Sequence, residues 1–477
     1  HHFSQNSKCY ECMVKNQDVR GIPLKRFDVI VVGAGTGGCL AAKTVADAGL
    51  DVCLIDRKRE EDVGEKVCGD AIGKHHFDDL GLDYPVGEEL ERRMIGVRIH
   101  SPDRENVFDV KGEKLYGFIV NRRLFGQRLL KNAIDAGATL LESTHALEPI
   151  IEQHSVTGVS AKNLKTGEKM KLFGQVVVDA SGYSAVLRKN LPAELGVEAN
   201  IDIKDVVVVY REIRELKEQV ADPNYCEIYL SQKWSPGGYS WFFAEGGKKV
   251  NVGLGVAMAN NFPNPKDQFY ENVLPMPLFD GSSVINAGTW YDPTRRPLDC
   301  MTGNGIVIVG DAACQVNPIH GGGMGPSMKG GACAGETIVE AIEKGDVSRD
   351  GLWSYNNRYL HSYGAKQAGL DVFRILLQGL GDEGLNYVME HRLITEEDLL
   401  KASMGEDARI NITEKTIRVF RGLRKLGLLK KLSEAANLLK RVRQHYLNYP
   451  VSPQGFDAWK RKAEAMVKEA ERLKEGK

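Results

Sequence analysis

Asp28-Val-Ile-Val-Val-Gly33-Ala-Gly35-Thr-Gly37-Gly38-Cys39-Leu-Ala-Ala42 is an apolar strand that runs into a glycine turn and then a helix of small residues. In a GxGxxG pattern the first glycine permits the tight turn, the second lets the backbone approach a pyrophosphate, and the third lets the helix pack on the sheet. These roles fall on Gly33, Gly35 and Gly38. Free N–H groups at the helix start favour an anion, so the stretch predicts a dinucleotide site.

A second apolar strand, residues 51–55, ends in Asp56. An acid about 20 residues beyond the glycine turn is the usual partner of ribose hydroxyls. A glycine-rich turn without a ligand would leave this acid unexplained. We therefore expect a Rossmann-type domain that begins near residue 26.

Length and composition bound the architecture. The chain has 477 residues, too many for one ordinary core, so two or three domains are expected. Its 63 Lys and Arg balance 64 Asp and Glu, and no nucleic-acid partner is expected. No run reaches the roughly 18–20 apolar residues of a spanning helix. Nine irregularly spaced cysteines favour a reducing, cytoplasmic setting.

The first 25 residues are expected to be a flexible leader or tag, because the chain opens with two histidines. Cys9 and Cys12 form a CxxC in this segment. No second pair follows at zinc-site spacing, so no metal site is predicted.

The predicted fold is α/β plus α+β, with three parts. A discontinuous nucleotide-binding domain is expected at 26–92, 118–202 and 291–345. Period-two alternation of apolar and polar residues predicts a β-rich domain at 93–117 and 203–290. In this domain Asn251, Gly253 and Gly255 leave one face of a strand nearly bare, so a neighbour or ligand can approach its backbone. Residues 346–477 are expected to be helical.

Two further buried strands end in an acid. Residues 176–179 end in Asp179, and residues 305–309 precede Gly310, Asp311 and a glycine loop. An acid that ends a buried strand needs a partner, which argues against an ordinary solvated charge at Asp311.

The tail is basic and amphipathic. Residues 401–477 hold 19 Lys and Arg against 9 Asp and Glu. A stripe at helical spacing consists of Leu428, Leu432, Ala435, Leu439, Val442 and Tyr446. A helix with this stripe could lie on an anionic lipid surface. Alternatively, it could pack on the other domains and expose a solvated basic face.

Four separated motifs, at 33–38, at Arg122 with Phe125, at 179–182 and at 310–325, resemble the flavin-binding motifs of para-hydroxybenzoate hydroxylase-like flavoproteins. Within that superfamily the chain resembles the geranylgeranyl reductases, especially the archaeal enzymes that saturate the isoprenoid chains of digeranylgeranylglycerophospholipid. The narrower resemblance rests on KVCGDA (66–71), SPGGYSWFF (235–243), PTRRPL (293–298) and NPIHGGGMG (317–325). One departure is Ala244, where the family pattern has proline after Phe243.

The resemblance implies noncovalent FAD. Thr36 and Gly37 would lie against the pyrophosphate, Asp56 would bind ribose, Arg122 would offset phosphate charge and Ala146 would meet the adenine edge. Cys68, Gly69 and Ala71 would border the flavin ring. The remaining implied cofactor residues are Asp179, Gly182, Gly310, Asp311, Pro318, Gly321, Gly322, Gly323, Met324 and Gly325.

The resemblance also implies a prenyl lipid substrate, for which an apolar tunnel is needed. Its expected wall is Pro236, Gly237, Gly238, Tyr239, Trp241 and Phe243. Arg295 and Arg296 would either bind a phosphate headgroup or pair with acids. An isolated alkene cannot stabilise a carbanion, so a proton donor is required, and Cys68 is the candidate, with Tyr239 and Trp241 completing the catalytic wall.

Two alternatives remain open at this point. A flavin monooxygenase shares the FAD motifs, and a prenyl-binding carrier similar to the Rab escort proteins shares the fold without redox chemistry. No second GxGxxG follows a strand, so the external electron donor, reduced ferredoxin or NAD(P)H, is undetermined. Peripheral contact with the inner face of the cell membrane is a further expectation for a lipid-modifying enzyme.

Overall fold

The computed structural model describes residues 22–112, 116–259, 262–404 and 426–475. A six-stranded sheet carries the nucleotide-binding region, in the order β19-β20-β13-β2-β3-β9. Its strands are β2 (Val29–Val32), β3 (Val52–Ile55), β9 (Thr139–Leu141), β13 (Val176–Asp179), β19 (Thr302–Gly303) and β20 (Ile306–Ile308). All neighbours except β19 and β20 are parallel. The central strands are buried throughout, as expected of a parallel sheet covered on both faces.

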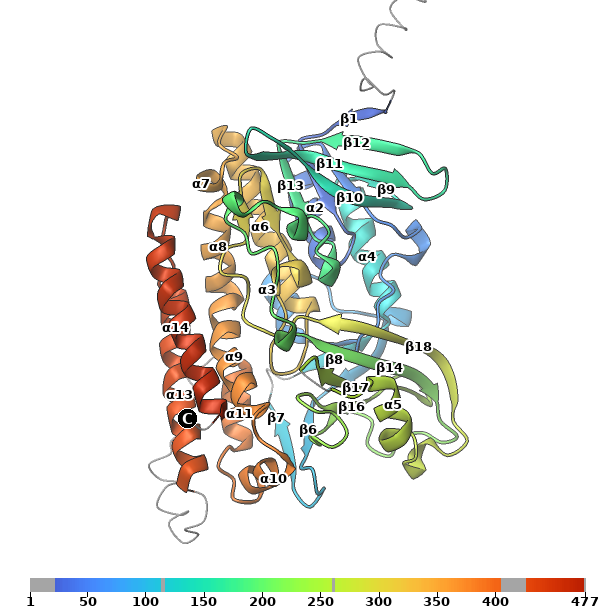
Figure 1. Cartoon of the computed structure of the whole chain (residues 1–477). Helices are drawn as coiled ribbons and strands as arrows, with labels where there is room; N and C mark the ends of the chain where they lie inside the picture. The colour runs from blue at the N-terminus through green and yellow to red at the C-terminus, as the bar shows by residue number, and fades with distance from the viewer. Residues whose placement is uncertain (1–21, 113–115, 260–261, 405–425, 476–477) are drawn as a thin grey trace, which may run out of the picture.

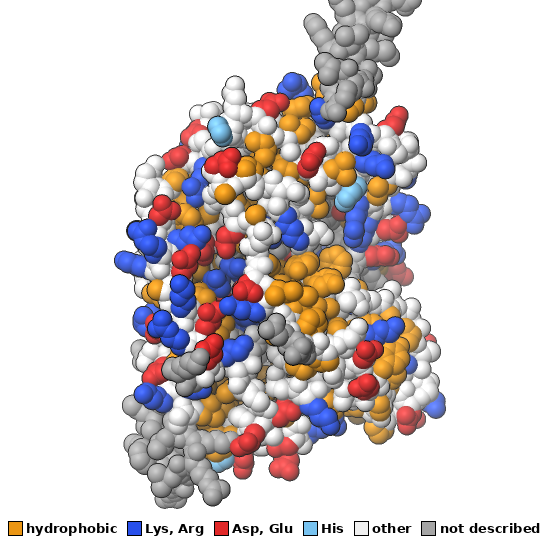
Figure 2. Space-filling view, viewed as in Figure 1, with side chains coloured by type: hydrophobic (Ala, Val, Ile, Leu, Met, Phe, Trp, Pro, Cys, Tyr) orange, Lys and Arg blue, Asp and Glu red, His pale blue; other side chains and the backbone are white. Residues whose placement is uncertain are grey.

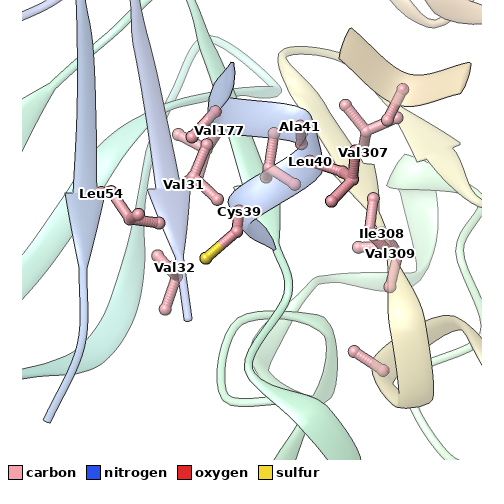
Figure 3. Packing of buried hydrophobic residues seen from close by; sticks show 14 of the residues in the cluster. Val31, Val32, Cys39, Leu40, Ala41, Leu54, Val177, Val307, Ile308 and Val309 are labelled. Carbon is pink, nitrogen blue, oxygen red and sulfur yellow. The ribbon is translucent and has the colours of Figure 1, made fainter. Parts of the chain in front are cut away.

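Helices cover this sheet through small residues. The covering helices are α2 (Thr36–Asp47), α4 (Arg122–Asp135) and α6 (Met324–Lys344), and α2 lies between the other two. Figure 3 shows Cys39, Leu40 and Ala41 of α2 packed among valines and other aliphatic residues of the strands. A Cβ on Gly331 would lie 2.1 Å from the carbonyl oxygen of Gly37, so glycine permits α6 to approach α2 this closely.

A four-stranded sheet, β1-β12-β11-β10, lies beside the nucleotide-binding sheet (Figure 1). Its strands are β1 (Leu24–Arg26), β10 (Thr144–Glu152), β11 (Ser155–Asn163) and β12 (Lys169–Phe173). Because β1 pairs in parallel with β12, the expected leader at 1–25 is too long: residues 24 and 25 belong to the fold. Residues 1–21, with Cys9 and Cys12, lie outside the described residues.

The strand that carries Trp241 and follows Tyr239, both of the expected catalytic wall, belongs to a seven-stranded sheet in the order β18-β14-β17-β16-β15-β6-β7. The strands are β6 (Gly96–His100), β7 (Val107–Lys111), β14 (Val207–Glu215), β15 (Tyr225–Tyr229), β16 (Ser240–Ala244), β17 (Lys249–Ala257) and β18 (Ser283–Asp292). Only β15 and β6 pair in parallel among these described strands. One face carries α5 (Pro265–Gln268), which contacts β14 and β17.

A small three-stranded sheet joins the two large ones. It consists of β4 (Ala71–Gly73), β5 (Leu90–Met94) and β8 (Gly117–Val120), and α3 (Lys74–Leu80) follows β4 directly. Residues 68–70, which precede β4, are thereby placed between the nucleotide-binding region and the seven-stranded sheet.

The C-terminal part is helical and lies along one side of the molecule (Figure 1). Its helices are α7 (Arg349–Leu352), α8 (Ser354–Tyr359), α9 (Ala365–Leu377), α10 (Asp382–Glu390), α11 (Glu396–Met404), α13 (Leu426–Leu447) and α14 (Phe456–Glu475). The apolar stripe of α13 packs against α9 and α14, and Leu432, Ala435, Val442 and Tyr446 are buried there.

Because this stripe is buried in the protein, it cannot bind lipid. The interpretation of the tail as a helix whose apolar stripe rests on a lipid surface is therefore wrong. The basic residues of these helices are interspersed with acids on the surface (Figure 2), and Arg441 pairs with Glu469 at 2.8 Å. Across the described part of the chain, none of the helices has the length and apolar character needed to cross a bilayer.

Candidate active site

One cavity of about 1630 Å³ connects the nucleotide-binding sheet with the seven-stranded sheet. We call its two parts the nucleotide half and the sheet half. The nucleotide half is lined by Gly33–Gly38, Asp56, Arg122, Ala146, Gly182, Gly310, Asp311, Pro318 and Gly321–Met324. The sheet half is lined by Val97, Ile99, Val207, Val209, Ile228, Gly237, Gly238, Tyr239, Trp241 and Phe243. Cys68, Gly69, Asp70 and Ala71 line the cavity between them.

The three fingerprint glycines have different surroundings. Gly33 has φ +104°, and a Cβ there would lie 2.2 Å from the carbonyl oxygen of Ala180. A Cβ on Gly38 would lie 1.8 Å from the carbonyl oxygen of Gly33, so the helix could not pack on the turn. Gly35 has nothing within 4 Å of its Cβ position and faces the cavity. Protein atoms therefore occupy the Cβ positions of Gly33 and Gly38, whereas the space at the Cβ position of Gly35 is open.

Arg122 is the clearest electrostatic feature of the nucleotide half. It is the first residue of α4, whose N-cap Asn121 accepts from the backbone N–H of Leu124 at 3.1 Å. The Arg122 side chain is buried, yet its Nε and Nη1 have no hydrogen-bond partner among the described residues. A buried guanidinium without a partner is costly, so this position calls for an anion in the cavity.

Acids at the strand ends fix the loops around this half. Asp56 accepts from the backbone N–H of Ala34 at 2.9 Å and of Lys58 at 2.8 Å, and it still lines the cavity. Asp311 pairs with Lys66 at 2.7 Å. Both carboxylates therefore hold a loop in place while they face the cavity.

Tyr239 ties the sheet to the glycine loop. Its hydroxyl donates to the carbonyl oxygen of His320 at 2.6 Å. Burial raises the pKa of this phenol above its ordinary value. Because its proton is engaged by a backbone carbonyl, Tyr239 acts as wall and brace, and the structure does not favour it as a proton relay.

The bare face of β17 is occupied by an indole. A Cβ on Gly253 would lie 2.5 Å from the Trp241 ring, so the glycine makes room for this side chain. Trp241 Nε1 donates to Asn251 Oδ1 at 2.9 Å. The third residue of this face, Gly255, faces Val207 and Val209 of β14. The neighbour expected to approach the backbone of this strand is therefore the protein's own side chains, Trp241 at Gly253 and the two valines at Gly255.

Asn251 links the wall to the loop that precedes β4. Its Nδ2 donates to Cys68 O and to Asp70 Oδ2, both at 2.9 Å. The Cys68 sulfur accepts from the backbone N–H of Asp70 at 3.4 Å. Burial, followed by the nearby Asp70 charge, raises the pKa of the Cys68 thiol to about 11, so the thiol stays protonated at neutral pH. Sequence reasoning named Cys68 and missed Asp70 and Asn251.

Comparison with known proteins gives the family. Residues 205–289 match the family model of the geranylgeranyl reductase catalytic domain, and residues 28–209 match that of lycopene cyclase protein. The digeranylgeranylglycerophospholipid reductase of Sulfolobus acidocaldarius is 42% identical over 93% of this chain and 98% of its own. The chain belongs to the digeranylgeranylglycerophospholipid reductase family. The resemblance read from the motifs is confirmed.

A second member of the digeranylgeranylglycerophospholipid reductase family, from Methanothrix thermoacetophila, is 31% identical over 81% of this chain and 96% of its own. Among solved structures, a geranylgeranyl bacteriochlorophyll reductase-like protein from Thermoplasma acidophilum has TM-score 0.73 and 23% identity, over 86% of this chain and all of that one. The myxobacterial chondrochloren halogenase, a FAD-dependent halogenase, has TM-score 0.60 and 16% identity over 88% of this chain and 97% of its own. These likenesses confirm the predicted fold class.

Five predicted residues of this reductase family member lie outside the cavity lining, and Arg295 and Arg296 are the most important of them. Arg295 is buried and Arg296 half-buried, and both lie among carboxylates. Arg296 lies 3.4 Å from Asp371, and Arg295 lies 3.8 Å from Glu198. The expectation of a headgroup site at the two arginines is therefore wrong, and the alternative, pairing with acids, is what the structure has. Nothing local to PTRRPL reveals the distant acids.

Asp179 was expected to bind the cofactor, and the structure gives it another role. Its fully buried carboxylate accepts from the backbone N–H groups of Ser181 at 3.1 Å, Leu187 at 3.1 Å and Arg188 at 2.7 Å. These bonds leave it no free face for a cofactor. Asp179 shapes the loop that presents Gly182 to the cavity.

Gly325 and Pro236 are also structural. A Cβ on Gly325 would lie 2.2 Å from the His76 ring, so this glycine admits an imidazole. The Pro236 carbonyl accepts from the backbone N–H of Ala257 at 2.9 Å. Both residues shape the loops that carry the cavity's lining residues.

Proposed function

We propose that this protein is an FAD-dependent reductase that saturates double bonds of geranylgeranyl chains, in archaeal-type ether phospholipid precursors or in geranylgeranyl diphosphate. The observation that carries the proposal is the continuity of one cavity. It joins a nucleotide half with an unpartnered cation to an apolar sheet half, with a protonated thiol between them.

The residues of the nucleotide half fit FAD. Arg122 would offset a phosphate charge, the open space at Gly35 would admit the pyrophosphate, and the start of α2 would supply N–H groups. At the other end, Gly323 and Met324 begin the 21-residue helix α6, whose N-terminus favours negative charge at the flavin ring. FAD, when bound, supplies the hydride for the reduction.

The sheet half fits a prenyl chain. Val207 and Val209 of β14 and Ile228 of β15 line it, and Trp241 and Phe243 of β16 complete a wall of apolar side chains. Such a wall binds a long alkene by burial and excludes water from the reacting carbon. Leu377, Leu385 and Leu399 of the C-terminal helices extend this lining.

The Cys68 thiol is proposed to place a proton on the alkene. A trisubstituted alkene accepts a proton to give tertiary-cation character, and the hydride then completes a saturated C–C bond. The thiol is left as a thiolate and must be reprotonated. Its raised pKa keeps it loaded at neutral pH but makes it a weak acid, so the transfer relies on precise placement beside the substrate.

The test is a mass measurement of the lipid. Digeranylgeranylglycerophospholipid is incubated without oxygen with the dithionite-reduced holoenzyme, and the extract is analysed by mass spectrometry. The proposal predicts a gain of about two mass units per saturated bond. A gain of about sixteen, seen only in air, would indicate a monooxygenase, and an unchanged lipid with a colourless protein would indicate a carrier.

An external donor, reduced ferredoxin or NAD(P)H, would replace dithionite in the cell. Each is tested by the rate at which it bleaches the bound flavin under nitrogen. A donor is accepted only if the bleached enzyme then saturates the lipid.

We infer that the lipid enters from a bilayer that touches β18. Residues 285–290 of this edge strand line the cavity, and Val284, Ile285 and Tyr291 are exposed. Figure 2 shows hydrophobic side chains gathered on the face that carries β18. Vesicles of archaeal-type ether lipid should co-sediment the protein, and Ile285→Glu should abolish this. Equal co-sedimentation of the variant would contradict the inference.

A further inference from the structure

Asp70 is a buried acid held in an unusual backbone conformation. It has φ +62°, in the left-handed region that residues other than glycine rarely adopt, and its side chain is 3% exposed. The turn lies between Cys68 and β4 and places the carboxyl in the cavity wall beside the thiol. Aspartate and asparagine tolerate this conformation better than most side chains.

The hydrogen bonds around Asp70 fix which oxygen can carry a proton. The indole N–H of Trp241 can only donate, so Asn251 Oδ1 is the acceptor and Asn251 Nδ2 the donor. Nδ2 donates to Asp70 Oδ2, which must therefore be an acceptor. In the neutral acid the proton sits on Oδ1, the buried oxygen that has no hydrogen-bond partner among the described residues.

The charged groups around Asp70 come from several elements. Burial raises its pKa to about 7, whereas the charges of Arg211 and Arg122 and the hydrogen bonds of Asn251 and Cys68 lower it. Glu245, a second buried acid on this cavity, repels it. A carboxyl of this pKa gives its proton readily to a thiolate whose conjugate acid has a pKa of about 11. The transfer from Asp70 to Cys68 is thus downhill.

We propose that Asp70 is the proton reservoir of this site, with Asn251 as the residue that orients it. After the Cys68 thiol has given its proton to the alkene carbon, the Asp70 carboxyl turns Oδ1 toward the sulfur and gives its proton to the thiolate, the S–H bond re-forms and Asp70 becomes a carboxylate. Water then returns a proton to Asp70. The proposal rests on the proposed prenyl reduction, and no oxidant or reductant takes part in this step.

The first test uses Asp70→Asn in the holoenzyme. Asparagine keeps the left-handed backbone and can still accept from Asn251, but it cannot supply a proton. Repeated turnover with prenyl lipid should fall about 100-fold while FAD content stays at the wild-type level. Wild-type turnover should decline as pH rises above about 7, because the donor must be protonated, and the variant should lack this decline. Wild-type turnover and an unchanged pH profile in the variant would overturn the proposal.

Glu245→Gln is the matched control, since Glu245 has a raised pKa of about 7 on the same cavity but no hydrogen bond to Cys68 or Asn251 is found among the described residues. Its variant should keep the alkaline decline. If the alkaline decline were lost in Glu245→Gln and kept in Asp70→Asn, Glu245 and not Asp70 would be the group that titrates, and the proposal would be overturned.

A second variant separates proton supply from a structural role. Asn251→Leu removes a hydrogen bond that lowers the pKa of Asp70, so the alkaline decline should move to higher pH. A residue that only braces the loop would lose rate equally at all pH values without such a shift, and that result would contradict the proposal.

The protonation itself can be measured without substrate or turnover. The infrared difference spectrum between wild type and Asp70→Asn should contain a protonated-carboxyl band that titrates near pH 7. A midpoint below about 5 would overturn the assignment even if lipid is reduced. Absence of lipid reduction in wild type, with this band present, would instead overturn the proposed function.

Discussion

The two halves of the cavity are built in different ways. In the nucleotide half, the glycine turn and the start of α6 come from short runs of sequence and present mainly backbone, and Arg122 adds one unpartnered charge. In the sheet half, single side chains from alternate positions of many strands form the wall. Cofactor binding is therefore encoded locally, whereas the reaction site depends on pairings such as Asp70 with Asn251, which are 181 residues apart.

The largest expected effect separates two glycines of the same turn. Gly38→Ala places a methyl 1.8 Å from a backbone oxygen, so the free energy of unfolding should fall by about 3 kcal/mol or more. Gly35→Ala meets no protein atom within 4 Å, so it should leave unfolding unchanged and weaken FAD binding. Thermal unfolding of the FAD-free variants measures their stability, and titration with FAD measures their affinity for the cofactor. Equal unfolding of the two variants would remove the distinction between packing and cofactor space.

The next effect concerns pH and the buried acids of the sheet half. Burial raises the pKa values of Asp70 and Glu245 to about 7, well above those of unfolded carboxyls near 4. Both are favoured in the folded protein when protonated, so their contribution is complete below pH 4 and is lost as pH rises through 7. Thermal stability without FAD should fall between about pH 4 and pH 7, by on the order of a few kcal/mol, and change little above that range.

The acid-to-amide variants supply the control for this pH effect. Asp70→Asn and Glu245→Gln should each flatten the decline in unfolding temperature. A decline of wild-type slope in the double variant would show that other groups cause it.

In the nucleotide half, Arg122→Met should weaken FAD binding by about 10- to 100-fold, because hydrogen bonds to charged groups contribute about 1.5–3 kcal/mol. The protein without FAD should be at least as stable as wild type, since methionine removes a buried cation whose Nε and Nη1 have no hydrogen-bond partner among the described residues. Flavin titration and thermal unfolding give the two values. A variant that loses stability but keeps FAD affinity would mean that Arg122 serves packing.

The smallest effect tests the link between the wall and Asn251. Trp241→Phe keeps an aromatic wall but removes the Nε1–H bond to Asn251 Oδ1, worth about 1 kcal/mol. Turnover should fall about fivefold while FAD stays bound. Release of FAD from the variant would place Trp241 in the cofactor site instead.

The difference between the halves also explains what the sequence could predict. The roles of Gly33, Gly35 and Gly38 follow from spacing, because each glycine acts on residues close to it in the chain. Asn251 was read as part of a bare strand face, since its partners Asp70 and Trp241 become neighbours only when the loop before β4 and strand β16 are placed beside it.

The errors have the same origin. The charge of Arg295 and Arg296 suggested a ligand, but the acids that neutralise it come from distant segments. The resemblance implied that Asp179 is a cofactor residue, but its own loop supplies its hydrogen-bond partners. The amphipathic stripe of α13 was compatible with a membrane or with protein, and only the placement of α9 and α14 decides for protein.

The most direct test of the account is whether filling the sheet half stops the reaction without disturbing the cofactor. Ile228 faces the cavity beside Trp241 on the neighbouring strand, so Ile228→Trp would occupy the space assigned to the prenyl chain. Under nitrogen, the reduced holoenzyme is mixed with digeranylgeranylglycerophospholipid, and flavin absorbance is followed. The account predicts that absorbance returns in wild type and stays bleached in the variant at equal FAD content. Return of absorbance at the wild-type rate in Ile228→Trp would contradict it.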